Sequence, residues 1–327
     1  MKKGPYRRKK RESNLTKRGV VFVLTAIAAF TAGAFLLNGV LFGGTPTASP
    51  PVEIESENDT TPAPDVSNIE VELTDFDEGV SDQIRLELLN VSTQQNVDLS
   101  GTKPRVLIYH THTTEAYTPT KKYTYTACGE WRTRQNDRNV VALGDKLAEL
   151  LNEKYGISVI HDTTDHEPPT LNTAYKRSLV TMLDYKEKNP SITLFIDLHR
   201  DAGSGGTVTI DGKEVSRMMF VVGTGKGATG TGYGEMPDFT SNYALAKKLT
   251  ERLRQIDPNL MRDIRVKSGR YNQHVSNQCL LVEVGTNINT FEQSLNAIDY
   301  LAQAIADVAG VSYEKDDAVQ TIYQFTP

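Results

Sequence analysis

From residue 103 onward, short runs of bulky apolar residues alternate with longer segments in which apolar side chains recur every three or four positions. Such runs are typical of buried strands, and such a period is typical of amphipathic helices. Strands are predicted at 106–109, 157–161, 192–199 and 279–285, a hairpin turning at Asp211-Gly212 at 207–223, and helices at 139–155, 172–188, 242–256 and 291–308. Because the strands are apolar almost throughout, we predict an α/β domain: a mostly parallel, twisted sheet flanked by helices.

A continuous apolar stretch of a different kind lies near the N-terminus. Residues 19–44 carry no charge, whereas the first 18 residues hold nine Lys or Arg. A helix of about 20 apolar residues spans a bilayer, and the flank rich in Lys and Arg stays in the cytoplasm. We predict a single-pass anchor at 19–44 in the cell membrane, with tail 1–18 cytoplasmic and the rest of the chain extracytoplasmic. The alternative, a cleaved signal peptide, would have a shorter apolar region.

The segment after the anchor changes composition. Pro, Thr, Ser and acidic residues dominate 45–66, and such a segment cannot bury enough apolar surface to offset its ordering entropy. We predict a disordered stalk and linker over 45–100, with enough apolar residues after position 67 for one short ordered element at the domain edge. The main domain is predicted at 101–312, followed by a tail at 313–327.

The charge distribution bears on the kind of partner, and the cysteine content bears on disulfide formation. The net charge is −5, and no basic patch with interleaved aromatic residues occurs outside the N-terminal tail, so nucleic acid is not an expected partner. Only Cys128 and Cys279 are present. An exported chain could pair them, but the apolar run after Cys279 favours free thiols.

Polar residues of chemical interest follow or interrupt three of the predicted strands. His110 and His112 follow VLIY, His199 and Arg200 follow LFIDL, and Glu283 lies inside CLLVEV. The carboxyl ends of parallel strands meet at one edge of a sheet, where sites form. A buried Glu is costly unless it is paired, binds a metal or lines a cleft. We therefore expect these side chains to meet.

Two histidines and a carboxylate at strand ends suit zinc. A catalytic zinc site has three protein ligands and an open position for water. We predict His110 and His199 as zinc ligands and Glu283 as the general base. The alternatives are a hydrogen-bonded structural role for each histidine and a buried salt bridge for the carboxylate.

The third zinc ligand stays open from the sequence. Glu115 is the first candidate because it lies five residues after His110, with Asp137 and His112 as alternatives. His112 and Arg200 are also predicted to bind substrate, since a guanidinium can hold a carboxylate through two hydrogen bonds. The alternative for Arg200 is a structural salt bridge. A serine hydrolase is disfavoured because the chain has no G-x-S-x-G motif.

Four segments together resemble the stage II sporulation protein P family of membrane-anchored peptidoglycan hydrolases. They are YHTHTTEAYTP (109–119), NVVALGDKLAELL (139–151), DLHRDA (197–202) and LVEVGTNIN (281–289). The resemblance covers roughly 103–310 and implies a fold related to the zinc N-acetylmuramoyl-L-alanine amidases. It also implies zinc as cofactor and cleavage of the amide between muramic acid and the stem peptide, with peptide cross-links as a second target. The implied partner is the stage II sporulation protein D lytic transglycosylase, and the implied setting is engulfment.

The resemblance also implies roles for single residues. His110 matches the first zinc ligand of those amidases, His199 the second histidine and Glu283 the catalytic glutamate. The amidases carry a ligand Glu just before their first helix, where this chain has Gln135 and Asp137. That departure supports a second hypothesis: a membrane-tethered module that binds the cell wall and has an inactive metal site.

Overall fold

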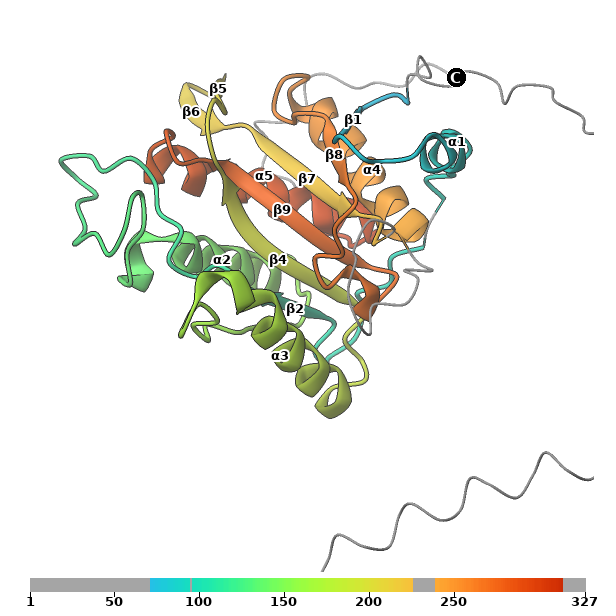
Figure 1. The fold of residues 1–327 in the computed structure, drawn as a ribbon, viewed down its shortest axis with the longest axis horizontal. Coiled ribbons are helices and arrows are strands. Elements are labelled where there is room, and N and C mark those ends of the chain that lie inside the picture. The colour runs from blue at the N-terminus through green and yellow to red at the C-terminus, as the bar shows by residue number, and fades with distance from the viewer. Residues whose placement is uncertain (1–70, 95, 226–238, 314–327) are drawn as a thin grey trace, which may run out of the picture. The chain divides into compact units, whose positions relative to one another are not determined.

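The computed structural model describes residues 71–94, 96–225 and 239–313 (Figure 1). The predicted basic tail, the anchor at 19–44, residues 45–70 of the predicted stalk and linker, and the tail after residue 313 lie outside the described residues. Among the described residues, no helix is both long enough and apolar enough to cross a bilayer.

One seven-stranded sheet organises the described residues, in the order β1-β8-β7-β9-β4-β2-β3. Every pairing in it is parallel except that of β7 with β9. The strands are β1 (Thr74–Phe76), β2 (Val106–Tyr109), β3 (Val159–His161), β4 (Leu194–Asp201), β7 (Met218–Gly223), β8 (Ile264–Lys267) and β9 (Cys279–Thr286). The prediction of a mixed α/β fold with a mostly parallel sheet is therefore confirmed.

Helices cover the two faces of the sheet unequally (Figure 1). Three helices, α2 (Val140–Glu149), α4 (Phe239–Ile256) and α5 (Phe291–Val308), bury their apolar stripes in one large core with alternate residues of β2, β4, β7 and β9. A smaller core forms on the other face, where Met182 of α3 (Ala174–Lys188) meets Leu107 and Phe195. A third, still smaller cluster on that face joins Leu281 to Met219 and Val221, with Tyr271 packed against it.

Capping side chains mark where two of the helices begin. The Asn139 side chain caps α2 by accepting a hydrogen bond from the Val141 N–H at 2.9 Å. Thr290 and Gln293 form a reciprocal capping box at the start of α5. After α2, the chain continues as a π-helical turn, Leu150–Lys154.

The hairpin and the cysteines are as the sequence indicates. Strands β5 (Thr207–Ile210) and β6 (Lys213–Ser216) pair antiparallel, and Asp211 and Gly212 in their turn have φ of 51° and 74°. The turn therefore has the two positive φ values that such a hairpin requires. Cys128 is exposed and Cys279 is buried, and no disulfide joins them.

Four elements differ from the sequence-based expectation. The segment before residue 101 contributes β1, which pairs with β8, and α1 (Asp82–Leu89), whose Ile84 and Leu88 join the large core. The folded unit thus begins before residue 101. Strand β7 leaves the predicted hairpin and joins the main sheet. Strand β8 was not predicted because its sequence, IRVK, alternates apolar with charged residues and has no apolar run.

Candidate active site

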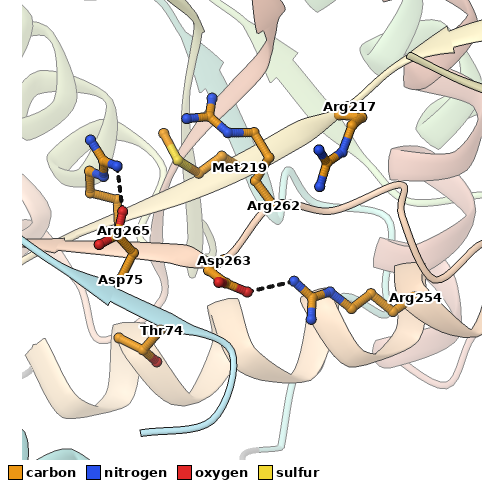
Figure 2. A pocket seen from close by; sticks show the side chains of 8 residues that line it. All are labelled: Thr74, Asp75, Arg217, Met219, Arg254, Arg262, Asp263 and Arg265. Atoms are coloured by element: carbon orange, nitrogen blue, oxygen red, sulfur yellow. Dashed lines mark hydrogen bonds and ion pairs between the residues drawn. The ribbon is translucent and has the colours of Figure 1, made fainter. Parts of the chain in front are cut away.

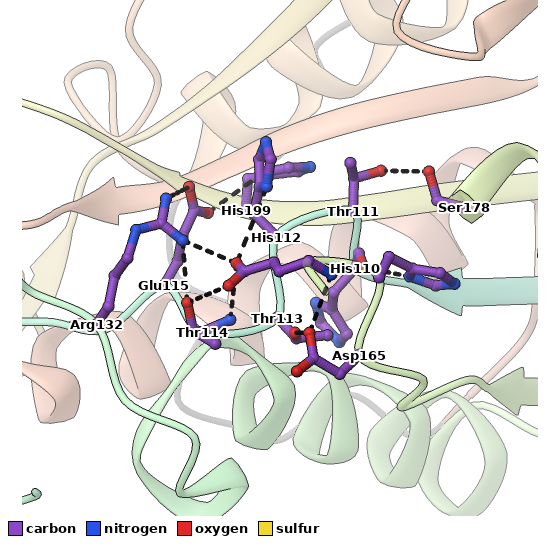
Figure 3. A network of polar contacts seen from close by, with 12 residues as sticks. His110, Thr111, His112, Thr113, Thr114, Glu115, Arg132, Asp165, Ser178 and His199 are labelled. Atoms are coloured by element: carbon purple, nitrogen blue, oxygen red, sulfur yellow. Dashed lines mark hydrogen bonds and ion pairs between the residues drawn. The ribbon is translucent and has the colours of Figure 1, made fainter. Parts of the chain in front are cut away.

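The carboxyl ends of β2, β4 and β9 lie at the same edge of the sheet. His199 of β4 stands directly beside Glu283 of β9 in the parallel register, and Tyr109 of β2 stands beside Asp197. The sequence-based expectation that these strand ends meet therefore agrees with the geometry. Residues 110–116, which follow β2, supply the remaining side chains of the site (Figure 3).

His110 does not face the other predicted ligands. It continues the alternation of β2 and points to α2, fully buried, where its Nδ1 lies 2.8 Å from the Leu198 carbonyl oxygen and its Nε2 2.9 Å from His161 Nε2. His161 Nδ1 in turn lies 2.9 Å from Asp145 Oδ1. Burial, followed by the neighbouring His161, lowers the pKa of His110 to about 3. With both ring nitrogens engaged, His110 has the geometry of the hydrogen-bonded structural histidine rather than that of the predicted ligand.

His112 takes the place that the sequence assigned to His110. The chain bends after β2, and the His112 ring meets the His199 ring edge to face, with centroids 5.5 Å apart (Figure 3). His112 Nδ1 is buried and has no hydrogen-bond partner. Its other side contacts the Tyr175 ring, with centroids 5.7 Å apart. Of the two histidines after β2, His112 is therefore the one that lies with His199.

Glu115 completes this group. Its Oε2 lies 3.3 Å from His199 Nδ1 and accepts a hydrogen bond from the Arg200 backbone N–H at 3.2 Å. The side chain is almost fully buried, which holds the carboxylate in one place. Asp137, the alternative third ligand, is exposed and pairs with its neighbour Arg138 at 2.8 Å. The geometry therefore favours Glu115 over Asp137.

Asp197 is a member of the site that the sequence reasoning missed. It is buried within β4, and its Oδ1 lies 2.8 Å from His199 Nε2. Thr111 fixes the same carboxylate through its backbone N–H at 2.8 Å and its hydroxyl at 2.6 Å. A carboxylate on the far nitrogen of a ligand histidine sets its orientation and tautomer. A charged residue inside an apolar strand was the available signal, as it was for Glu283.

The pKa values of His199 and Glu115 shift in opposite directions. Burial would lower the pKa of His199, but the carboxylates of Asp197 and Glu115 outweigh burial and raise it well above its ordinary value. Burial would raise the pKa of Glu115, but His199 and Arg200 lower it to about 2. Without a metal, His199 and Glu115 therefore form an ion pair, and a metal that binds them must displace a proton.

The pKa of Glu283 shifts in the opposite direction to that of Glu115. Burial raises its pKa to about 8; His199 opposes that shift and Glu115 adds to it. Its Oε2 is buried and has no hydrogen-bond partner. A carboxyl group with a pKa near neutral can both accept a proton and donate it, which is the property of a general acid–base.

Arg200 has a different role from the predicted substrate clamp. Its guanidinium donates to the backbone carbonyls of Ala116 at 3.0 Å, Trp131 at 3.1 Å and Asp201 at 3.3 Å. The residue is only 8% exposed. Arg200 therefore ties the loop after β2 to the end of β4, with one N–H of each guanidinium nitrogen engaged by backbone.

Arg132 and Glu167 are further residues that no sequence signal pointed to. Arg132 Nη1 lies 2.8 Å from Glu167 Oε1 and 3.0 Å from Thr114 Oγ1, while its Nη2 lies 3.8 Å from Glu115 Oε1 (Figure 3). The Thr114 hydroxyl also donates to Glu167 Oε2 at 2.6 Å. This network fixes Glu115 from the side opposite His199.

The donor set of the site fits zinc in kind. His112 and His199 offer imidazole nitrogens and Glu115 offers carboxylate oxygens, which are the donors found in catalytic zinc sites. His112 Nδ1 and Glu283 Oε2 are buried without hydrogen-bond partners, as expected of groups arranged for a ligand. In the part of the chain that the structure describes, no three His, Cys, Asp or Glu side chains already converge on one metal position. Metal binding would therefore have to draw these side chains together.

Comparison with known proteins identifies the family of this chain. A family model described as Stage II sporulation protein P matches residues 45–306. The chain belongs to this family. The resemblance seen in the sequence is thus confirmed. The stage II sporulation protein P of Bacillus subtilis (strain 168) is 32% identical over 230 residues, which are 65% of this chain and 52% of the relative. The chain therefore spans about half the length of the curated relative that it matches.

Two solved structures that match part of this chain are amidases by name. The N-acetylmuramoyl-L-alanine amidase AmiC2 of Nostoc punctiforme is 17% identical with a TM-score of 0.36, covering 64% of this chain and 97% of its own. The N-acetylmuramoyl-L-alanine amidase of Clostridium difficile 630 is 16% identical with a TM-score of 0.36, covering 63% and 95%.

Proposed function

We propose that this family member is a zinc-dependent peptidoglycan hydrolase that cleaves the muramoyl-L-alanine amide, with peptide cross-links as a second target, during sporulation. The observation that carries the proposal is the gathering of His112, His199 and Glu115 at one sheet edge, beside a carboxyl group whose pKa is raised to about 8. The family membership and the amidase names of the structural neighbours agree with it.

The proposed zinc ligands are His112, His199 and Glu115, a revision of the sequence-based set in which His112 replaces His110. When bound there, zinc would polarise the scissile carbonyl and make a water more acidic. Asp197 holds His199 in the tautomer that leaves Nδ1 facing Glu115. Zinc favours the deprotonated forms of its ligands, so it would displace the proton that His199 and Glu115 share in its absence.

Glu283 is the proposed general base. It stands next to His199 in the register, so a water held in front of the ligands would lie within its reach. We propose that the carboxylate takes the proton of the attacking water and passes it to the leaving amine. Its neighbours at the site keep it largely out of bulk water, which raises its pKa towards the pH at which both transfers are efficient.

Zinc content and wall clearing together test the proposal. Full-length protein loaded with zinc should retain about one metal ion per chain and clear purified peptidoglycan in a gel. His112→Ala and His199→Ala should lose both the metal and the clearing, whereas Glu283→Gln should keep the metal and lose the clearing. His110→Ala serves as the matched histidine control, because it should keep zinc if it remains folded. Zinc retained by His112→Ala, or clearing that survives Glu283→Gln, would contradict the assignment.

A second function, a wall-binding module with an inactive metal site, rests on the incomplete convergence of metal donors among the described residues. It predicts that zinc-loaded wild type sediments with peptidoglycan but never clears it. Sedimentation of the Glu283→Gln variant supplies the control, since both functions predict that this variant still binds the wall.

The setting of the enzyme is also a proposal. A single-pass anchor at 19–44 would hold the domain on the outer side of the cell membrane, close to the peptidoglycan. A lytic transglycosylase such as stage II sporulation protein D would cut the glycan strands that an amidase leaves intact. Protease digestion of intact cells tests the orientation, because the domain should be digested and the basic tail protected.

A further inference from the structure

A hollow lined in part by Met219, the residue paired with Glu283, is not used by the proposed reaction. The cavity measures about 360 Å³ and is lined by Thr74, Asp75, Arg217, Met219, Arg254, Arg262, Asp263 and Arg265 (Figure 2). Its volume falls within the range of small-ligand sites, which begins at about 300 Å³. Four of the eight lining residues are arginines and two are aspartates, and Asp201 and Asp77 pair with two of these arginines from outside the lining.

Three of the four arginines already have acidic partners. Arg254 pairs with Asp263 at 2.8 Å, Arg262 pairs with Asp201 at 2.6 Å, and Arg265 pairs with Asp75. Arg265 Nε also lies 3.6 Å from Asp77 Oδ1, whereas the Nε atom of Arg254 is buried without a hydrogen-bond partner. One donor of these three paired arginines therefore remains that the neighbouring carboxylates do not satisfy, as expected beside a site for an anion.

Arg217 is the arginine that the pocket does not neutralise. Its Nε donates to the Asn259 carbonyl oxygen at 2.7 Å, and it forms no ion pair with any described residue. It immediately precedes β7, and its side chain reaches into the hollow (Figure 2). The hydrogen bond to Asn259 fixes one edge of the guanidinium and leaves its terminal nitrogens to a ligand.

The pocket adjoins the proposed catalytic carboxylate. Met219, which forms part of its lining, pairs directly with Glu283 across β7 and β9. Residues paired in this way have Cα atoms about 5 Å apart. Arg262 also reaches Asp201, at the end of the strand that carries His199. A substrate whose scissile bond lies before Glu283 would therefore extend over this pocket.

We infer that this arginine pocket is a substrate subsite that binds a carboxylate of the stem peptide while the bond to be cut lies at Glu283. The inference rests on the proposed function and assigns to the pocket the clamp that sequence reasoning had assigned to Arg200. A planar guanidinium matches a carboxylate with two parallel hydrogen bonds. Arg217 supplies the uncompensated charge, because Arg262 and Arg265 are paired with carboxylates.

Equilibrium binding tests the subsite apart from catalysis. Full-length protein carrying Glu283→Gln, so that substrate is not consumed, is titrated in a calorimeter with two muropeptides, one with free carboxylates and one with the same groups as carboxamides. The free form should bind at least about tenfold more tightly. Adding Arg217→Gln should remove that preference, whereas Arg217→Lys, which keeps the charge, should retain most of it. Arg85→Gln, an arginine of α1 outside the pocket, is the matched control and should leave both affinities unchanged.

Several outcomes would overturn the inference. Equal binding of the two muropeptides, or a preference that survives Arg217→Gln, would exclude a carboxylate subsite. Inorganic phosphate that competes with the free form as well as the peptide itself would assign the pocket to phosphate groups instead. If the arginine-dependent preference is present but zinc-loaded wild type cleaves neither muropeptide, the subsite stands and the proposed hydrolysis fails. In an active enzyme, Arg217→Gln should raise KM about tenfold and change kcat little.

Discussion

Gly144, inside α2, offers a sharp test of the buried histidine pair. A glycine in the middle of a helix ordinarily destabilises it, so replacement by alanine should raise stability by about 1 kcal/mol. Here a Cβ atom at position 144 would lie 2.5 Å from His161 Nε2 and 2.7 Å from His110 Nε2. Both separations are far below an ordinary contact, so the rings would have to move.

The energetic cost of moving the two rings decides whether Gly144→Ala stabilises or destabilises the protein. His110 is fully buried and held by the Leu198 carbonyl, so it has little room to shift. Overpacking of this kind costs about 1–3 kcal/mol, and a buried nitrogen separated from its partner costs about 1–3 kcal/mol more. After subtraction of the helix-propensity gain, we expect Gly144→Ala to lower the free energy of unfolding by roughly 3 kcal/mol.

Urea unfolding followed by circular dichroism measures this change as a shift in midpoint at constant slope. The matched control is the same substitution in a His161→Ala background, where the closest contact is gone. Gly144→Ala should be at least about 1 kcal/mol less harmful there, which a double-mutant cycle reports as coupling. If Gly144→Ala stabilised the wild-type protein by about 1 kcal/mol, the packing of this pair would be refuted.

Four further predictions concern stability and the site. The pKa of His110 is about 3 when folded and near 6.5 when unfolded, so the unfolded state binds more protons below pH 6.5. The stability advantage of wild type over His110→Gln should therefore be complete above pH 6.5 and shrink by up to about 1.4 kcal/mol per pH unit as the pH falls, measured by urea midpoints. The raised pKa of Glu283 acts in the opposite direction and cancels in this difference; a gap that does not change with pH would contradict the account. Asp197→Asn should weaken zinc binding about 10–100-fold in a chelator competition while the protein stays folded, and unchanged affinity would exclude its orienting role. Arg200→Lys should speed amide hydrogen exchange in the loop after β2, because lysine cannot hold three backbone carbonyls together; exchange as slow as in wild type would show that the loop is held otherwise. Cys128 should react with a thiol reagent in the native protein, and Cys279 only after unfolding, which mass spectrometry distinguishes; equal reaction rates would contradict the burial of Cys279.

Much of the fold follows from local pattern. Apolar runs and helical periods located β2, β4, β9 and the main helices, because those patterns reflect how each segment buries its own side chains. Asp211 and Gly212 fixed the hairpin, since few residue pairs accept positive φ in succession. His199 and Glu283 were expected to meet because the carboxyl ends of parallel strands share one edge. Strands β1 (TDF) and β8 (IRVK) contain no apolar run, because polar or charged residues interrupt them, so no pattern was recognised there.

The sequence by itself determined the family, the layered α/β architecture and the strand ends at which a site would form. Only the tertiary structure decided which side chains enter that site. His110 and His112 are alike in local sequence, but a bend after β2 turns one toward α2 and the other toward His199. Arg200 is directed to backbone carbonyls of a loop about 70 positions earlier in the chain. Such choices depend on contacts between distant segments, for which a local pattern carries no signal.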